Sequence, residues 1–309
     1  MPIGGGQILG GALVPRFAFI GDQLITNGDF GVDTTGWTFV GDAGGITRVA
    51  DSYVPWGDYS AEVNDGDLSN YAYATTDVAM VTGGSYIASA WFRRETSNAD
   101  NAYLEIQEPD SSVSFQSWGA SKWGGYADQQ YNVLSMMVDQ VSGVGNGELH
   151  IYPTGDTVAA TGKCYIARVR MWQILEWFTL GATAMIPTYL PSPEIPTWTP
   201  VFKHRHQNAG GARTREVLGY RYENTFAYPV AQDLHAEKII RMASGAPMFL
   251  WPHYDPNSKI FFGLAVRCVG HFEANYPQKS SRGDGYIGRV MNLRFRSYDL
   301  VPTIPEELV

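Results

Sequence analysis

Residues 24–37 read LITNGDFGVDTTGW and place two groups of turn-forming residues around isolated aromatic side chains. Asn-Gly-Asp occupies 27–29 and Thr-Thr-Gly occupies 34–36, and these residue types favour tight turns for steric and hydrogen-bonding reasons. Phe30 stands alone between the two groups, and Trp37 closes the segment. The segment therefore predicts the start of a β-domain in which turns separate short strands.

From this segment to about residue 175, the sequence alternates between apolar and other residues with a period of two. The alternation is clear in SYIASAWFRR at 85–94, YLEIQ at 103–107, GELHIYP at 147–153 and YIARVRMW at 165–172. Short alternating strands between Gly, Asp, Asn and Ser turns are typical of an antiparallel sandwich. Residues 24–175 are therefore predicted to form such a sandwich.

The chain changes character after this region. The segment MIPTYLPSPEIPTWTP at 185–200 is dense in proline, which disfavours a helix or a central strand and favours an extended spacer. Beyond it, QDLHAEKIIRMASG at 232–245 is the one good helix among several alternating strands. The predicted fold is mostly β, with an N-terminal arm at 1–23, an antiparallel β-sandwich at 24–175, a Pro-rich linker or arm at 176–202, and a β-barrel or sandwich with one α-helix at 203–309.

Composition narrows the class of protein. Aromatic residues make up 13% of the 309 residues, which favours sheets and binding surfaces over helical bundles. The net charge is −11 over residues 1–175 and +2 over residues 176–309, so the acidic first half argues against nucleic acid or an anionic membrane as its partner. No apolar run is long enough to predict a membrane span, and no basic start predicts a signal peptide. Cys164 and Cys268 are expected to be buried thiols.

Few residues form a pattern typical of catalysis. The sequence holds no G-x-S-x-G or H-E-x-x-H motif. His204 and His206 form only half of a metal site, because no Cys or nearby carboxylate completes it. Glu105 and Glu148 face away from the apolar set of their strands, so we interpret them as solvent-exposed acids rather than as a glycosidase pair. The chain is therefore expected to be a non-enzyme without a cofactor.

Four segments of the first half resemble a known family. They are LITNGDF…TTGW at 24–37, GDYSAEV at 57–63, VTGGSYIASAWFRR at 81–94 and GKCYIARVRMW at 162–172. In this order and spacing they resemble the carbohydrate-binding modules of the family-4/9 type. The resemblance implies a jelly roll that binds glycan chains by stacking sugar rings on aromatic side chains.

The loop sequence FQSWGASKWGGY at 115–126 is the expected place for such stacking. Trp118, Trp123 and Tyr126 are large aromatic residues in a Gly/Ser-rich setting, with the polar Gln116 beside them. An exposed aromatic ring removes the apolar face of a sugar from water. We therefore predict these four residues as the glycan-binding site. The alternative is that the aromatic residues cap the end of the sandwich or pack on another subunit.

The resemblance also implies a structural calcium ion, but the sequence departs from the family pattern at two ligand positions. The family commonly has an acidic residue after the NGDF-like motif and an Asp before the Val of the final strand. Here Gly31 and Ala167-Arg168 occupy those places. Asp29 and Asp33 remain as weak calcium candidates, since calcium requires several oxygen ligands.

The second half resembles the tail-tube or distal-tail module of tailed bacteriophages. The segments that carry this resemblance are the 232–245 helix, APMFLWPHY at 246–254, FFGLAVRCVGHFE at 261–273 and GRVMNLRFRSYDL at 288–300. The resemblance implies stacked rings of identical subunits. Arg294, Arg296 and Trp198 are the residues predicted at the assembly interface, since such interfaces are enriched in Arg and aromatic side chains.

Together these features predict a structural protein of a phage virion, most simply a distal-tail or baseplate component that assembles into a ring. The jelly roll would project and bind host-surface polysaccharide, and the partners would be copies of the chain and other virion proteins. Nucleic acid binding and membrane insertion are not expected. One alternative is an extracellular carbohydrate-binding protein or accessory module of a polysaccharide-degrading system. Another alternative is a capsid decoration protein.

Overall fold

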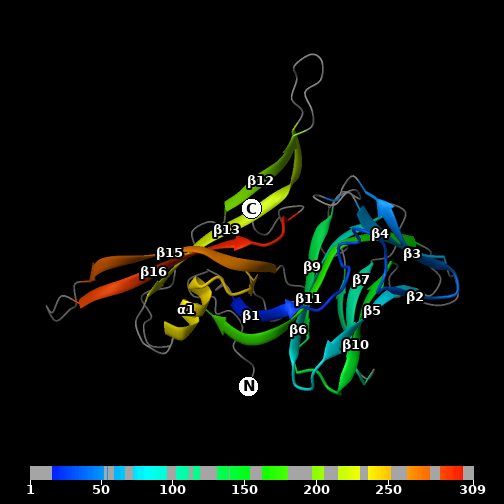
Figure 1. The fold of residues 1–309 in the computed structure, drawn as a ribbon, viewed down its shortest axis with the longest axis horizontal. Coiled ribbons are helices and arrows are strands. Elements are labelled where there is room, and N and C mark those ends of the chain that lie inside the picture. Colours follow the sequence, from blue (N-terminus) through cyan, green and yellow to red (C-terminus); the bar gives the residue numbers. More distant parts are fainter. Residues whose placement is uncertain are drawn as a thin grey trace, which may run out of the picture.

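The computed structural model consists of antiparallel β-strands and one short helix, which confirms the predicted mostly-β fold (Figure 1). The structure describes residues 16–51, 54, 59–66, 72–95, 102–110, 114–118, 131–138, 140–153, 162–179, 197–204, 215–229, 236–251, 263–278 and 286–301. Within these residues, no helix is long and apolar enough to cross a membrane.

In the described residues, a five-stranded back sheet and five strands of an 11-stranded sheet, here called the front sheet, form the N-terminal sandwich. The back sheet has the order β2 (Thr38–Val40), β5 (Tyr73–Met80), β10 (Gly145–Tyr152), β7 (Tyr103–Gln107) and β8 (Ser114–Trp118). The front sheet pairs β3 (Gly44–Ala50), β4 (Tyr59–Asp65), β11 (Gly162–Thr179), β6 (Ser85–Arg94) and β9 (Asn132–Val138) in that order. Alternate residues of both sheets fill the core between them, among them Val63, Phe92, Leu104, Leu149 and Ile166.

The opening segment, residues 24–37, closes one side of this core. Phe30 is fully buried and its ring centroid lies 5.5 Å from that of Trp37, so both isolated aromatic residues belong to the core. The turn between them is held by Asn27, whose Nδ2 donates to the backbone oxygens of Asp33 and Thr35 at 2.9 and 3.2 Å. Asn27 adopts a φ of 55°, a conformation that Asn tolerates better than most residues.

The front sheet continues without a break into the C-terminal half. Strand β11 is long enough to leave the sandwich, and its last part pairs with β1 (Arg16–Gln23). Beyond β1 the sheet continues through β14 (Met248–Trp251), β15 (Leu264–Gln278), β16 (Tyr286–Ser297), β13 (Arg215–Pro229) and β12 (Thr197–His204). The helix α1 (Ala236–Ala243) lies against this sheet, where Met242 joins a second core with Phe17, Phe19, Val266 and Phe295.

The element bounds differ from the predicted segment boundaries. Residues 16–23, predicted as part of an arm, form β1 between β11 and β14, where Phe17 and Phe19 are fully buried. The predicted boundary at 175/176 falls inside β11, and the predicted linker includes the start of β12. The physical reason is that β1 and β11 pair over a long sequence separation, which local periodicity does not reveal. The remaining predicted arm and linker residues, 1–15 and 180–196, lie outside the described part of the chain.

The C-terminal half also packs on the outer face of the front sheet. Ile87 and Trp91 of β6 point away from the sandwich core, yet both are buried. Ile87 lies in a cluster with Phe249 of β14, and Trp91 lies in a cluster with Leu300. The two halves are therefore joined by a shared sheet and by two apolar clusters.

A buried polar cluster stabilises the same outer face. The Asp51 carboxylate accepts hydrogen bonds from Arg93 and from the Tyr131 hydroxyl, each at 2.7 Å. The Arg93 guanidinium also lies 3.8 Å above the ring of Tyr165. Burial raises the pKa of Tyr131, and the Asp51 charge raises it further. These contacts connect the loop residue Asp51 and Tyr131 to Arg93 of β6 and Tyr165 of β11.

Both cysteines are free and buried, as predicted. Burial raises the pKa of the Cys164 thiol well above its usual range, and it also raises that of Cys268. A thiol that stays protonated is a poor nucleophile and a poor metal ligand. The two residues therefore contribute apolar packing.

Candidate functional site

Strand alternation places a set of aromatic and polar side chains on the solvent side of the back sheet. In β10, Leu149 and Ile151 face the core, so Glu148, His150 and Tyr152 face the opposite way. The register pairs His150 with Thr75 of β5 and with Glu105 of β7. We name this surface the outer band and define it by Tyr73, Thr75, Tyr103, Glu105, Glu148, His150 and Tyr152.

Three tyrosines form a continuous row across the outer band. The rings of Tyr103 and Tyr152 are stacked, with centroids 4.3 Å apart and an interplanar angle of 12°. The ring centroid of Tyr73 lies 4.8 Å from that of Tyr152 and 4.5 Å from that of His150. These separations follow the spacing of adjacent strands, so β7, β10 and β5 each contribute one ring to the row.

A hydrogen-bonded network lies beside this row. His150 Nε2 is 2.8 Å from Glu148 Oε2, and His150 Nδ1 is 3.3 Å from Glu105 Oε1. The Thr75 hydroxyl donates to the same Glu148 oxygen at 2.9 Å. His150 and Glu105 are 2% and 5% exposed, whereas the Glu148 side chain is 40% exposed. The network therefore fixes Glu148 while leaving part of its carboxylate accessible to a ligand.

The electrostatics of the outer band follow from this arrangement. Partial burial raises the pKa of Glu148, but the hydrogen bonds from His150 and Thr75 and the charge of His150 outweigh it, and the pKa is lowered. Burial and the nearby Glu148 and Glu105 carboxylates raise the pKa of Tyr73. Burial also raises the pKa of Tyr152, as does Glu105. At neutral pH the tyrosines are thus neutral rings with hydroxyl groups, beside an ionised carboxylate.

Two of the four residues predicted to bind glycan lie in the described part of the chain. Gln116 and Trp118 lie in β8, where they pair in register with Glu105 and Tyr103 of the outer band. Trp123 and Tyr126 lie outside the described residues. The tyrosine row and His150 were not predicted from the sequence, although the period-two alternation of β10 indicates which of its side chains face away from the core. From the sequence we interpreted Glu105 as a solvent-exposed acid. In the structure it is buried, and its carboxylate lies within hydrogen-bonding distance of His150.

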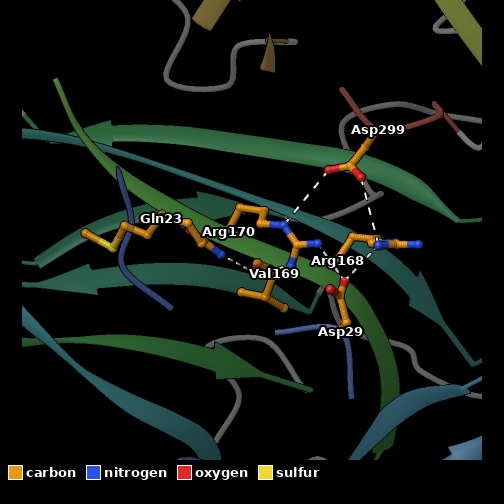
Figure 2. Close-up of polar contacts among 7 residues, drawn as sticks. Gln23, Asp29, Arg168, Val169, Arg170 and Asp299 are labelled. Atoms are coloured by element: carbon orange, nitrogen blue, oxygen red, sulfur yellow. Dashed lines mark hydrogen bonds and ion pairs between the residues drawn. The ribbon is translucent and has the colours of Figure 1, made fainter. Parts of the chain in front are cut away.

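The two calcium candidates have protein partners instead. Figure 2 shows Asp29 facing the guanidinium groups of Arg168 and Arg170, whose nitrogens lie 3.1 and 2.6 Å from Asp29 Oδ1. Asp33 accepts hydrogen bonds from the Thr35 amide and hydroxyl at 2.9 and 2.8 Å. The Thr35 amide and hydroxyl lower the pKa of Asp33, with Asn27 adding to the effect. Among the described residues, no three His, Cys, Asp or Glu side chains are arranged to hold a metal ion.

The residues predicted at the assembly interface have partners within the chain. Arg296 Nε lies 2.5 Å from Glu223 Oε1, and Arg294 bonds the other oxygen of the same carboxylate. The Trp198 ring packs edge-on against Tyr222, with centroids 5.1 Å apart. Glu223 thus ties β13 to β16. The role of these residues in assembly stays a prediction.

Comparisons with known proteins find solved structures that are similar to about half of the chain. No protein-family model matches the sequence, and no curated protein sequence matches it. Among solved structures, a Family 16 Carbohydrate Binding Module-2 is 16% identical with a TM-score of 0.36, over 48% of this chain and 98% of that one. The CBM22-1 xylan-binding domain from Paenibacillus barcinonensis is 14% identical with a TM-score of 0.37, over 51% of this chain and 97% of that one.

The enzymatically active domain of the bacteriophage CBA120 tailspike protein 4 is also similar. It is 14% identical with a TM-score of 0.38, over 49% of this chain and 21% of that one. Values of this size carry no conclusion about the function of this chain. Its function has to be argued from the outer band and from the sequence.

Proposed function

We propose that the N-terminal sandwich binds a glycan chain on the outer band. The observation that carries the proposal is the row of Tyr73, Tyr152 and Tyr103 on three adjacent strands beside the Glu148 carboxylate. Tyr103 stacks on Tyr152, and Tyr73 lies tilted against Tyr152. The C–H face of a sugar ring is apolar, so it is favourably removed from water against an aromatic ring. The hydroxyl groups at the edge of the sugar can then donate to Glu148, which is held in place by His150 and Thr75.

The direction of the row suits a chain-like ligand. The three rings succeed one another across the strands β5, β10 and β7. A glycan lying across the strands would meet the partly exposed rings of Tyr73 and Tyr152, while Tyr103, which is 3% exposed, stacks on Tyr152 and holds its ring in place. The resemblance of residues 24–172 to carbohydrate-binding modules supports the same ligand class.

The test is to replace the middle ring of the row. Tyr152→Ala removes the ring that contacts both neighbours, and the loss of stacking of about 1–1.5 kcal/mol corresponds to about a tenfold weaker affinity. The full chain is first tested on an array of glycans, and the affinity for those that bind is measured by calorimetry. Tyr298→Ala is the matched control, because Tyr298 is exposed and follows β16 in the C-terminal half.

Two results would contradict the proposal. One is the absence of binding by the unaltered chain to any glycan on the array. The other is equal affinity of the unaltered chain and Tyr152→Ala. The proposed role is binding without turnover, so release of reducing sugar from a bound polysaccharide would contradict that part.

We also propose that the C-terminal half is an assembly platform, and that the chain is a structural component of a phage tail in the virion. The observation that favours this role is the hairpin of β12 and β13, which forms the edge of the larger sheet and extends from it (Figure 1). Phe202 and Val217 are register partners on this hairpin and are 38% and 46% exposed. Exposed apolar pairs at a sheet edge are typical of surfaces that another subunit covers.

Light scattering and negative-stain microscopy of the full chain test this second role. We expect a ring or another closed multimer, and we expect Phe202→Ser to weaken it. A strict monomer at high concentration would contradict the assembly role. If such a monomer binds glycan, an extracellular binding protein or accessory module explains the chain better.

A further inference from the structure

We propose that the outer band selects glycans by charge, and that Glu148 is the specificity-determining residue that excludes polyanionic chains. The inference rests on the proposed glycan-binding function and narrows its ligand class to chains without carboxylate, sulfate or phosphate groups. It follows from the distribution of charge on the back sheet.

Charged side chains are divided unequally between the two sheets. Among the described residues, the five strands of the back sheet contain no Lys or Arg. The cations of the sandwich strands all belong to the front sheet, namely Arg48, Arg93, Arg94, Lys163, Arg168 and Arg170. A polyanion on the outer band would therefore find no cationic partner on these strands.

The acids of the back sheet, in contrast, lie on its solvent side. Glu148 pairs in register with the exposed Asp77 of β5 on one side and with Gln107 of β7 on the other. His150 lies between Glu148 and Glu105, so even a protonated His150 leaves the group of three with a net negative charge. Asp77 adds to this charge. A bound uronate would place its carboxylate close to these groups, where like charges repel.

Of the two acids that contact His150, Glu148 is the one that a ligand can reach while the ligand stacks on the tyrosine row. Glu105 contacts His150 and is buried, so a ligand cannot reach its carboxylate. Glu148 keeps 40% of its side chain exposed, and it is tied to His150, whose ring lies 4.5 Å from Tyr73. Its carboxylate is therefore fixed at the edge of the aromatic row. A rigid charge discriminates better than a mobile one, because it cannot turn away from an unsuitable ligand.

The experiment compares glycans that differ only in charge. The pairs are a β-1,4-glucan and its C6-oxidised form, a β-1,4-mannan and its C6-oxidised form, and methyl-esterified and free polygalacturonate. We expect the full chain to bind an uncharged member at least tenfold more tightly than its carboxylated counterpart. This ratio should shrink at 0.5 M NaCl, because salt screens the repulsion.

Glu148→Gln removes the charge and keeps an oxygen that can accept from Thr75. We expect it to reduce the preference for the uncharged member over the carboxylated one about tenfold, because the charge that repels the carboxylate of the ligand is gone. Asp77→Asn, at an exposed position, should act in the same direction and more weakly. Glu62→Gln is the matched control, because its carboxylate pairs with Lys163 at 3.0 Å on the front sheet.

Equal affinity of the unaltered chain for charged and uncharged members overturns the inference and leaves glycan binding intact. An unchanged ratio in both Glu148→Gln and Asp77→Asn also overturns it. If the unaltered chain binds no glycan on the array or in the pairs, the proposed function fails, and this inference fails with it.

Discussion

Gly28 is the residue at which the opening segment touches β11. A Cβ added to Gly28 would lie 2.0 Å from the backbone oxygen of Val169, and the Val169 amide donates to the Gly28 oxygen at 2.9 Å. Neither backbone can move without breaking this contact. We expect Gly28→Ala to lower the free energy of unfolding by about 1–3 kcal/mol through overpacking. Urea denaturation measures the change.

Gly31 provides the control for this prediction. It lies in the same segment, it is exposed, and an added Cβ would meet nothing within 4 Å. Gly31→Ala should therefore leave the free energy of unfolding nearly unchanged. Equal effects of the two substitutions would show that the close approach of Gly28 to Val169 is unimportant.

Glu223 makes the stability of the C-terminal sheet depend on pH. Burial raises its pKa, but the hydrogen bonds and charges of Arg294 and Arg296 outweigh this effect, so the folded-state pKa lies below the ordinary value of 4.5. Its stabilising contribution is therefore complete above that value and is lost as the pH falls through the lower, folded-state pKa. Urea titrations between pH 7 and pH 3 should show this decline.

Glu223→Gln should reduce the pH dependence, because the ionisable group is gone. The variant is less stable than the unaltered chain at pH 7, and the difference narrows toward pH 3. A difference that stays constant over this range would contradict the assignment of a lowered pKa to Glu223.

At the scale of the element, a charged cluster joins the opening segment, β11 and the residues after β16. Asp29 bonds Arg168 and Arg170, and Asp299 approaches both guanidiniums at 4.0 Å (Figure 2). Arg168 adopts a φ of 51° at the irregularity of β11 between 167 and 170, which turns the strand toward this cluster. The two arginines thus provide the positive charge that pairs with Asp29.

The charged cluster around Asp29 leads to a prediction about calcium binding and thermal stability. Addition of calcium or EDTA should leave the melting temperature unchanged, because Asp29 and Asp33 are already engaged by donors. Asp29→Asn should cost about 1 kcal/mol, since charge-assisted hydrogen bonds at a half-exposed site are screened. Thermal denaturation with and without calcium measures both effects. If calcium raises the melting temperature and Asp29→Asn abolishes this rise, Asp29 binds calcium and the prediction is wrong.

The same elements show what the sequence could predict. Alternation in residues 85–94 predicts β6 and its inward face correctly, because strand periodicity is a local property. It does not predict that Ile87 and Trp91 on the opposite face are buried, since Phe249 and Leu300 come from far along the chain. The strand β1 was missed for the same reason.

In the candidate site too, local periodicity predicts which way side chains face but not which strands become neighbours. The faces of Glu148 and Glu105 are evident from the alternation of their strands. Their meeting at His150 depends on the order β5-β10-β7, in which strands distant in sequence become neighbours. Local sequence cannot supply that order. The sequence therefore predicted the tryptophans of residues 115–126 and could not predict a tyrosine row that is assembled from three strands. The role of those tryptophans stays a prediction.

At the scale of the whole molecule, the shared sheet predicts that the two halves unfold together. Strand β11 pairs with β4 and β6 in the sandwich and with β1 in the C-terminal half, so neither half can lose its strands without exposing the other. We expect the full chain to show one calorimetric transition, with equal calorimetric and van't Hoff enthalpies.

A variant at the contact between the halves sharpens this expectation. Trp91 is 3% exposed and packs between the front sheet and Leu300, so Trp91→Ala should cost about 3–5 kcal/mol. Because the loss lies on the surface that both halves share, the single transition should shift to lower temperature as a whole. Two resolved transitions in the unaltered chain, or a shift of only one of them in Trp91→Ala, would instead show two independent domains. The proposed glycan-binding face and assembly platform would then be separate modules, whereas a single transition means that both belong to one cooperative unit.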